Sequence, residues 1–237
     1  MFRRMIISLF IMGQSSAQAF CQVVPEGSEI QELIRIGESF RIKPFIAFNI
    51  HYAYSDSATW PTPVQEISAT YRMSEGRYAA VIDSTELMQG TNFNLVVYHD
   101  SKVILVSEKK PVDEGLLQVS ALDSLFVANL VDSMEVTTVN DSTRKLEIHF
   151  RPEAPFVHYE ITYNPTTYLI RKVLYYQRST GDEVENYSVI EAVFSNYSES
   201  PISDTYFMES KFIYRTDTGI MARSPYQDYE VIMNGAL

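Results

Sequence analysis

The feature that most constrains the fold is a two-residue period of apolar side chains, which recurs along most of the chain. The first run starts at Phe45, and its apolar face contains Ile46, Phe48, Ile50, Tyr52 and Tyr54. Successive side chains of a strand point to opposite faces, so this period predicts a strand with one buried face. The same period predicts further strands over 66–73, 77–83, 86–92, 93–99, 102–108, 145–150, 156–163, 168–177, 186–194, 205–215 and 229–234.

Two of these strands, 93–99 and 102–108, are apolar on both faces. The turn at Asp100 and Ser101 fixes how they pair. The expected pairs are Val97 with Ile104 and Leu95 with Val106 on one face, and Tyr98 with Val103 and Val96 with Leu105 on the other. A strand pair that is apolar on both sides has to be covered on both sides.

Two segments show the helical period instead. In 27–40, Ser28 stands three residues before Gln31, which is the spacing of a capping box. The segment 119–136 predicts an amphipathic helix because its apolar residues, together with Asn129, recur at intervals of three and four, at Leu122, Leu125, Phe126, Asn129, Leu130 and Met134. Helix, strands, helix and strands in this order predict an α+β fold with a mostly antiparallel sheet.

The N-terminus has the three parts of a secretory signal peptide. Arg3 and Arg4 are followed by a short apolar stretch over 5–12 and by a small-residue site that ends at Ala19. We therefore expect a signal peptide over 1–19 and an exported, periplasmic mature chain. The apolar stretch is shorter than the ~20 residues that a membrane-spanning helix needs, and no later stretch approaches that length.

Cys21 follows the expected cleavage site and raises the alternative of a lipid-anchored N-terminus. Phe20 disfavours it, because a lipid-modified cysteine is preceded by a small residue. As the only cysteine of the chain, Cys21 cannot form an internal disulfide. The exported domain must then be stabilised by its own core.

Charge and motifs exclude several classes of function. The formal net charge is −11 and becomes −13 when Arg3 and Arg4 leave with the signal peptide, which argues against nucleic acid as a partner. The sequence contains no nucleophile elbow, no zinc-protease motif and no glycine-rich phosphate loop. We therefore expect a protein that is not an enzyme and needs no cofactor.

One constellation of polar residues suggests metal binding. If strands 145–150 and 156–163 pair through their apolar residues, His149 lies opposite His158 and Glu147 opposite Glu160 on the other face. Two imidazoles and two carboxylates can hold a divalent metal. An ordinary solvated strand face is the favoured interpretation, because the expected next pairing places Arg171 opposite Glu160.

The segment 157–176 reads as a hairpin that contains five of the sixteen tyrosines. The turn signal Asn164-Pro165 suggests that Tyr163 lies opposite Tyr168. Strand parity then assigns one face to Tyr159, Tyr163, Tyr168, Tyr176, Ile161 and Ile170, and the other face to Tyr175 and Phe156.

The chain resembles the periplasmic outer-membrane lipoprotein-carrier (LolA-like) superfamily, and most of all its divergent bacterial members of unassigned function. The resemblance covers the mature chain in outline and is clearest over 144–199, in "YEITYNPTTYLIRKVLYY" and "ENYSVIEAVFSNYSES". It implies one domain over 20–237, a strongly curved antiparallel half-barrel with amphipathic helices on its concave side. It also implies a hydrophobic cavity that receives acyl chains. The ligand-release arginine of the carrier has no counterpart that we can place, so lipoprotein transport itself is not carried over.

The function that these expectations favour is an exported, non-enzymatic carrier or binding protein for a lipid, an acylated envelope lipoprotein or another apolar ligand. An aromatic and aliphatic cavity binds such ligands through the apolar area removed from water. The candidate cavity residues are Phe48, Ile50, Tyr52, Leu95, Val97, Ile104, Val106, Phe126, Leu130, Tyr159, Ile161, Tyr163, Tyr168 and Ile170. The alternatives are a cell-envelope structural or assembly factor with the same fold and no ligand and, least favoured, a metal-dependent hydrolase that uses His149, His158 and Glu147.

Overall fold

The computed structural model describes residues 29–56, 58–109, 130–178, 187–217 and 219–234. The chain divides into two compact units. Unit 1 comprises 1–42, 54–64 and 113–191, and unit 2 comprises 43–53, 65–112 and 192–237. The expected signal peptide and Phe126 lie outside the described residues. The single domain expected over 20–237 stays a prediction.

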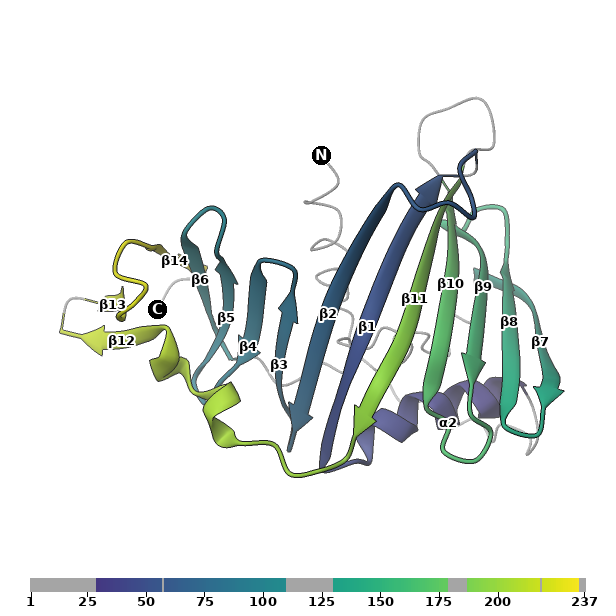
Figure 1. The fold of residues 1–237 in the computed structure, drawn as a ribbon, viewed down its shortest axis with the longest axis horizontal. Coiled ribbons are helices and arrows are strands. Elements are labelled where there is room, and N and C mark those ends of the chain that lie inside the picture. The colour runs from purple at the N-terminus through teal and green to yellow at the C-terminus, as the bar shows by residue number, and fades with distance from the viewer. Residues whose placement is uncertain (1–28, 57, 110–129, 179–186, 218, 235–237) are drawn as a thin grey trace. The chain divides into compact units, whose positions relative to one another are not determined.

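Twelve strands of the described chain form one mostly antiparallel sheet, in the order β14-β6-β5-β4-β3-β2-β1-β11-β10-β9-β8-β7. The sheet is not closed into a barrel, and β14 and β7 are its edge strands (Figure 1). The chain also contains the helix α2. The predicted α+β class with a large antiparallel sheet is therefore confirmed. No helix within the described ranges combines the length and the apolar character needed to cross a membrane.

Unit 1 contains α2 (Glu29–Arg41) and the strands β7 (Val131–Asn140), β8 (Thr143–Phe150), β9 (Phe156–Tyr163) and β10 (Ile170–Arg178). The helix predicted over 27–40 is confirmed by α2, which buries Leu33, Ile36 and Phe40 and contacts β7 and β8. These three residues recur at intervals of three and four, so they lie on one face of the helix. That face closes the core of unit 1.

Unit 2 contains β2 (Gln65–Ser74), β3 (Arg77–Ile82), β4 (Thr85–Gln89), β5 (Phe93–Tyr98) and β6 (Val103–Glu108), which pair in sequence order. Two strands contribute residues to both units, β1 (Phe45–Asp56) and β11 (Tyr187–Ser198). The final strand, β14 (Glu230–Asn234), pairs with β6 in parallel and covers its edge. The expected pairs between 93–99 and 102–108 are all confirmed.

The second predicted helix is wrong for its C-terminal part, because Leu130 is helical but the residues after it are not. Residues 131–136 belong to β7, which pairs with β8, and residues 119–129 lie outside the described part. The apolar residues Val131, Met134 and Val136 fit either period over so short a stretch. Eight residues of β7 pair with residues of β8, and this pairing favours the strand.

The strand predicted over 205–215 is also wrong for most of its length. Residues Asp204–Phe207 and Glu209–Lys211 form the short 3₁₀ helices η2 and η3, and a strand begins only at Ile213. This strand, β12 (Ile213–Thr216), forms a separate two-stranded sheet with β13 (Gly219–Ala222). The two buried aromatic residues of the segment, Phe207 and Phe212, are five residues apart. Phe207 lies in η2, which contacts β3 and β4, and Phe212 packs in the core cluster of unit 2.

Candidate ligand pocket and the predicted cavity residues

A pocket of unit 2 has its floor on β2, β3 and β4. Arg72 pairs with Ala79 across β2 and β3, and Ala79 and Val81 pair with Met88 and Glu86 across β3 and β4. Directly paired side chains share one face of a sheet, so these five residues all point to the same side. Met88 in turn pairs with Leu95 of β5, which places the pocket on the face that carries the core of unit 2.

The roof of this pocket is the segment that contains η2 and η3. Its start is fixed by Ser203, whose hydroxyl accepts a bond from the Thr205 N–H at 3.4 Å, and by Arg77, which binds Asp204 at 2.7 Å. Glu209 attaches the middle of the segment, since its carboxylate accepts bonds from the backbone N–H groups of Asn92 and Phe93 at 2.5 and 2.8 Å.

Gly90 permits this close approach. A Cβ atom added to Gly90 would lie only 2.3 Å from the Cγ atom of Glu209. Any other residue at position 90 would therefore push the Glu209 side chain, and the segment with it, away from β4.

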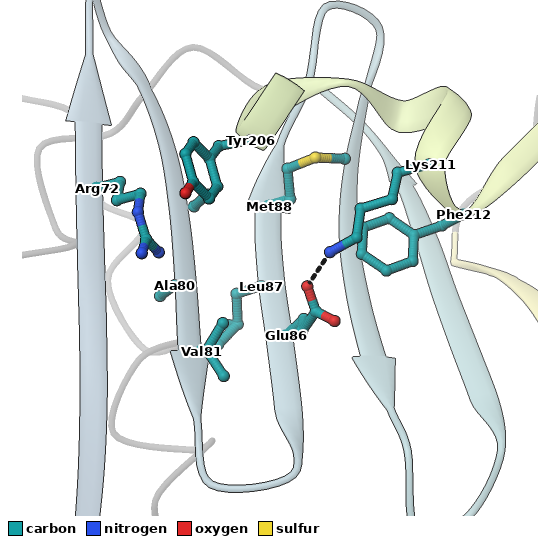
Figure 2. A pocket seen from close by; sticks show the side chains of 10 residues that line it. Arg72, Ala80, Val81, Glu86, Leu87, Met88, Tyr206, Lys211 and Phe212 are labelled. Atoms are coloured by element: carbon teal, nitrogen blue, oxygen red, sulfur yellow. Dashed lines mark hydrogen bonds and ion pairs between the residues drawn. The ribbon is translucent and has the colours of Figure 1, made fainter. Parts of the chain in front are cut away.

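The pocket has a volume of about 300 Å³. This is the lower end of the usual range for small-molecule sites. Figure 2 shows the residues that surround it. They are Arg72, Ala79, Ala80, Val81, Glu86, Leu87, Met88, Tyr206, Lys211 and Phe212. Most of the lining is apolar, and its charged groups are two cations and one carboxylate.

The charged groups are held in defined positions. The Lys211 ammonium binds Glu86 at 2.6 Å, and the Arg72 guanidinium lies over the Tyr206 ring at 4.2 Å from its centroid (Figure 2). Glu86 also meets His99 at 3.0 Å, and the other ring nitrogen of His99 meets the Tyr229 hydroxyl at 3.0 Å. The lining therefore carries a net charge of about +1 in a chain of strongly negative charge.

Four of the predicted cavity residues lie beside this pocket. Leu95, Val97, Ile104 and Val106 are almost fully buried in one cluster with Met88 and Phe212, two residues that also line the pocket. The cluster is covered by residues of the C-terminal segment, including Tyr226, Tyr229, Val231 and Met233. One face of the doubly apolar hairpin is thus covered, as the sequence required.

Three other predicted residues of unit 2 lie in β1. Phe48 and Ile50 are buried, and Tyr52 is half-buried with its hydroxyl 3.4 Å from that of Tyr71. Phe48 stacks on Tyr71 with ring centroids 5.3 Å apart and also contacts Phe194 and Tyr197. These residues form an aromatic cluster of their own.

Three of the predicted residues of unit 1 are almost fully buried, and one of them, Tyr163, contacts a buried carboxylate. Ile161, Tyr163 and Ile170 are each at most 1% exposed, and the Tyr163 hydroxyl donates to Glu32 of α2 at 2.5 Å. Arg144 binds the other oxygen of Glu32 at 3.3 Å. Burial first, and then the bond to Glu32, raise the pKa of Tyr163. Leu130 and Tyr159 are half-buried residues of the same unit.

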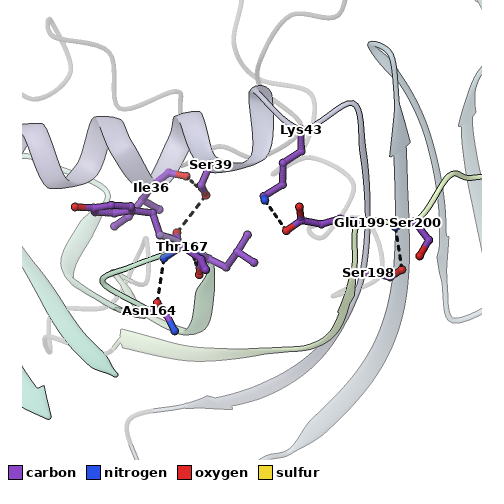
Figure 3. Close-up of polar contacts among 10 residues, drawn as sticks. Ile36, Ser39, Lys43, Asn164, Thr167, Ser198, Glu199 and Ser200 are labelled. Carbon is purple, nitrogen blue, oxygen red and sulfur yellow. Dashed lines mark hydrogen bonds and ion pairs between the residues drawn. The ribbon is translucent and has the colours of Figure 1, made fainter. Parts of the chain in front are cut away.

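Tyr168 lies at the end of the β9–β10 loop and contacts α2 twice. Its hydroxyl accepts from Arg35 at 3.0 Å, and its carbonyl oxygen accepts from Ser39 at 3.2 Å. The loop itself is held by Asn164, whose side chain accepts a bond from the N–H group of Thr167 (Figure 3). The same side chain accepts a bond from the N–H group of Thr166. These bonds tie the loop to itself and to the helix within unit 1.

The pairing predicted for this hairpin is wrong. Tyr163 pairs with Ile170, and a bulge at Arg171 then shifts the register so that Tyr159 pairs with Tyr175 and Glu160 with Leu174. The extra residue reverses the parity of β10. Tyr175 therefore shares a face with Tyr159, at a ring distance of 4.9 Å, and Tyr176 lies on the opposite face against His158.

The pairing predicted for β8 and β9 is confirmed. Glu147 pairs with Glu160 and His149 with His158, and the two imidazole rings stack with centroids 4.4 Å apart. Burial first, and then His149, lower the pKa of His158. The expected contact of Arg171 with Glu160 is replaced by a bond from Arg171 to Thr143 at 2.9 Å.

Sequence reasoning missed the pocket residues of the roof, Tyr206, Lys211 and Phe212. They lie in the segment 205–215, for which the sequence predicts a strand because tyrosine and phenylalanine are typical of strands. The available signal was Ser203 directly before Asp204, a pair typical of the start of a helical turn.

No known family and no curated protein matches the chain. Several solved structures are similar. An uncharacterized conserved protein from Thermus thermophilus is 8% identical, with a TM-score of 0.47, and the match covers 87% of this chain and 100% of that one.

A LolA superfamily protein from Nitrosomonas europaea is 10% identical, with a TM-score of 0.35, and covers 78% of this chain and 99% of its own. The lipoprotein LppX from Mycobacterium tuberculosis is 11% identical, with a TM-score of 0.40. The match covers 76% of this chain and 99% of LppX. The superfamily that the sequence resembles is thus represented among the similar solved structures.

Proposed function

We propose that the chain is an exported, non-enzymatic binding protein or carrier for a lipid or another ligand with an apolar body, and that the pocket of unit 2 takes part of this ligand. The observation that carries the proposal is the composition of the pocket. Its apolar wall is formed by Ala79, Val81, Met88 and Phe212, and two cations line the same pocket. An apolar wall binds through the area it removes from water, while a few polar groups fix the orientation of the ligand.

The charges in the pocket favour a ligand with an anionic group. Glu86 is neutralised by Lys211, and Arg72 remains as the second cation. A carboxylate or phosphate at the end of an acyl chain complements this arrangement. The expected exported location and the resemblance of the sequence to the LolA-like superfamily are in keeping with such a ligand.

Filling the pocket tests the proposal. Val81 lines the pocket and is 39% exposed, so Val81→Trp places an indole ring at the pocket without disturbing a buried residue. We expect 1-anilinonaphthalene-8-sulfonate to bind the wild type and to be displaced by decanoate. Val81→Trp should weaken the binding of each compound at least about tenfold, which corresponds to about 1.4 kcal/mol of binding free energy.

The matched control is Val139→Trp on β7 of unit 1, where Val139 is 57% exposed. This variant should bind like the wild type. Equal binding by Val81→Trp and the wild type would remove the pocket from the proposal. A wild type that takes up neither compound would favour the alternative of an envelope structural factor without a ligand.

The charge of the ligand is tested at Lys211. Lys211→Gln removes one cation and releases Glu86, so the net charge of the lining changes from about +1 to about 0. Decanoate should then lose more affinity than decanol, which has the same chain length and no charge. An equal loss for both compounds would contradict an anionic ligand.

A further inference from the structure

The polar face of unit 1 carries two neighbouring rows of metal-ligating side chains. In one row, Glu135 pairs with Glu147 and Glu147 with Glu160, on the three adjacent strands β7, β8 and β9. In the next row, His149 pairs with His158. Both rows point away from the face that α2 covers, because Leu146 and Ile148, which alternate with Glu147 and His149, are buried.

The carboxylate row lacks the cation that the sequence assigned to it. Like charges directly opposite one another on neighbouring strands destabilise a sheet. Because of the bulge at Arg171, Glu160 pairs with Leu174, and the Arg171 guanidinium binds Thr143. The ion pair that the structure shows in this row is that of Lys145 with Glu147, at 3.0 Å. One ammonium for three carboxylates leaves an excess of negative charge.

His158 lies between two of these carboxylates without a hydrogen bond to either. Its Nε2 atom is 3.8 Å from Glu147 Oε1, and its Nδ1 atom is 3.9 Å from Glu160 Oε1. Both distances exceed the range of a hydrogen bond. The Nε2 atom is buried and has no hydrogen-bond partner among the residues that the structure describes, which is costly for a polar atom unless another ligand satisfies it.

We infer that Glu147, His158 and Glu160 bind a divalent transition-metal ion such as Zn²⁺, with the stacked His149 as a fourth donor within reach. One ligand atom from each of the first three residues lies within 4.8 Å of the others. Ligand atoms around a tetrahedral zinc ion are about 3.3 Å apart, so small side-chain rotations close the site. A set of imidazole and carboxylate donors suits Zn²⁺ better than Ca²⁺ or Mg²⁺, which prefer oxygen ligands alone.

The first test replaces both carboxylates by amides of the same shape. Glu147→Gln/Glu160→Gln should lower the affinity for Zn²⁺ at least about 100-fold, since the loss of outer-shell partners alone costs about 10- to 100-fold. The same double variant should unfold at a higher temperature than the metal-free wild type, because it removes like-charge repulsion. A purely structural role of these residues predicts the opposite change in stability.

The second test removes the competing ammonium group. Lys145 occupies an oxygen of Glu147, so Lys145→Gln should free this oxygen and increase the affinity for Zn²⁺. A gain of binding cannot result from general damage to the fold. Binding is measured on the tag-free full chain by calorimetric titration with Zn²⁺ and by the visible absorption of Co²⁺ in the same site.

The control pair is His51 and Glu66 of unit 2, which lie 3.3 Å apart on an exposed part of the sheet. His51→Gln/Glu66→Gln should bind one equivalent of Zn²⁺ like the wild type. The inference is overturned if the wild type binds no Zn²⁺, if Glu147→Gln/Glu160→Gln binds it unchanged, or if the control variant loses it equally.

Discussion

At the scale of single residues, the carboxylate of Glu32 shows how a polar group is accommodated in the core of unit 1. Glu32 is 8% exposed and meets the Tyr163 hydroxyl and the Arg144 guanidinium. A buried carboxylate without such partners is strongly unfavourable. These contacts therefore fix α2 against β8 and β9. The sequence indicated the amphipathic helix but not this contact, since Glu32 and Tyr163 are 131 positions apart.

Tyr163→Phe should lower the free energy of unfolding by about 1–3 kcal/mol, because it leaves Glu32 buried with one donor fewer. The measurement is urea denaturation followed by circular dichroism. Tyr214→Phe is the control, since Tyr214 is 45% exposed, and it should change stability by less than about 0.5 kcal/mol. Equal stability of Tyr163→Phe and the wild type would show that the hydroxyl does not support the carboxylate.

At the scale of elements, the hairpin of β9 and β10 has a strand register that the pattern of apolar residues does not determine. The β5–β6 register follows from the sequence because the turn at Asp100 and Ser101 fixes it, and the β8–β9 register follows because one pairing aligns the apolar residues. The β9–β10 register does not follow, because it depends on the loop, where Tyr168 has a φ of +57°, and on the bulge at Arg171. Both are matters of backbone geometry that leave no mark in the period of side chains.

A double-mutant cycle tests this register. The rings of Tyr159 and Tyr175 meet edge to face, so the cycle of Tyr159→Leu and Tyr175→Leu should give a coupling energy of about 0.5–1.5 kcal/mol. The cycle of Tyr159→Leu and Tyr176→Leu should give a coupling near zero, because Tyr176 stacks on His158 on the opposite face. Coupling between Tyr159 and Tyr176, without coupling between Tyr159 and Tyr175, would support the β9–β10 register that lacks the bulge.

In the candidate pocket, the sequence pattern predicts the strands of the floor but not the C-terminal segment that forms the roof. The strands that form the pocket floor were predicted within a few residues of their ends, from alternation and turn residues. The roof was not, because η2 and η3 are short turns placed by long-range contacts such as that of Glu209 with Asn92. A local pattern does not contain such contacts.

At the scale of the whole molecule, buried tyrosines link stability to alkaline pH. Burial raises the pKa of Tyr54 to about 12 and also raises the pKa of Tyr159 and Tyr197. Their protonated forms are favoured in the folded state, so their contribution is fully present below the unfolded pKa of about 10. For Tyr54 it is lost as the pH rises from about 10 to about 12.

We therefore expect stability to fall steeply above pH 10, with Tyr54 contributing on the order of 2 kcal/mol. Tyr54→Phe should reduce this fall, and Tyr214→Phe, at an exposed position, should not. The measurement is urea denaturation at pH values of about 8, 10, 11 and 12, which bracket the two pKa values. An identical pH profile for Tyr54→Phe and the wild type would contradict the assignment.

The central claim, that the chain binds an apolar ligand with an anionic group in the pocket of unit 2, is tested most directly by native mass spectrometry of the freshly purified protein. We expect one copurified ligand per chain, or uptake of one decanoate by an empty chain, in the wild type and in Val139→Trp, and neither in Val81→Trp. A wild type that is reproducibly empty and takes up no decanoate would contradict it.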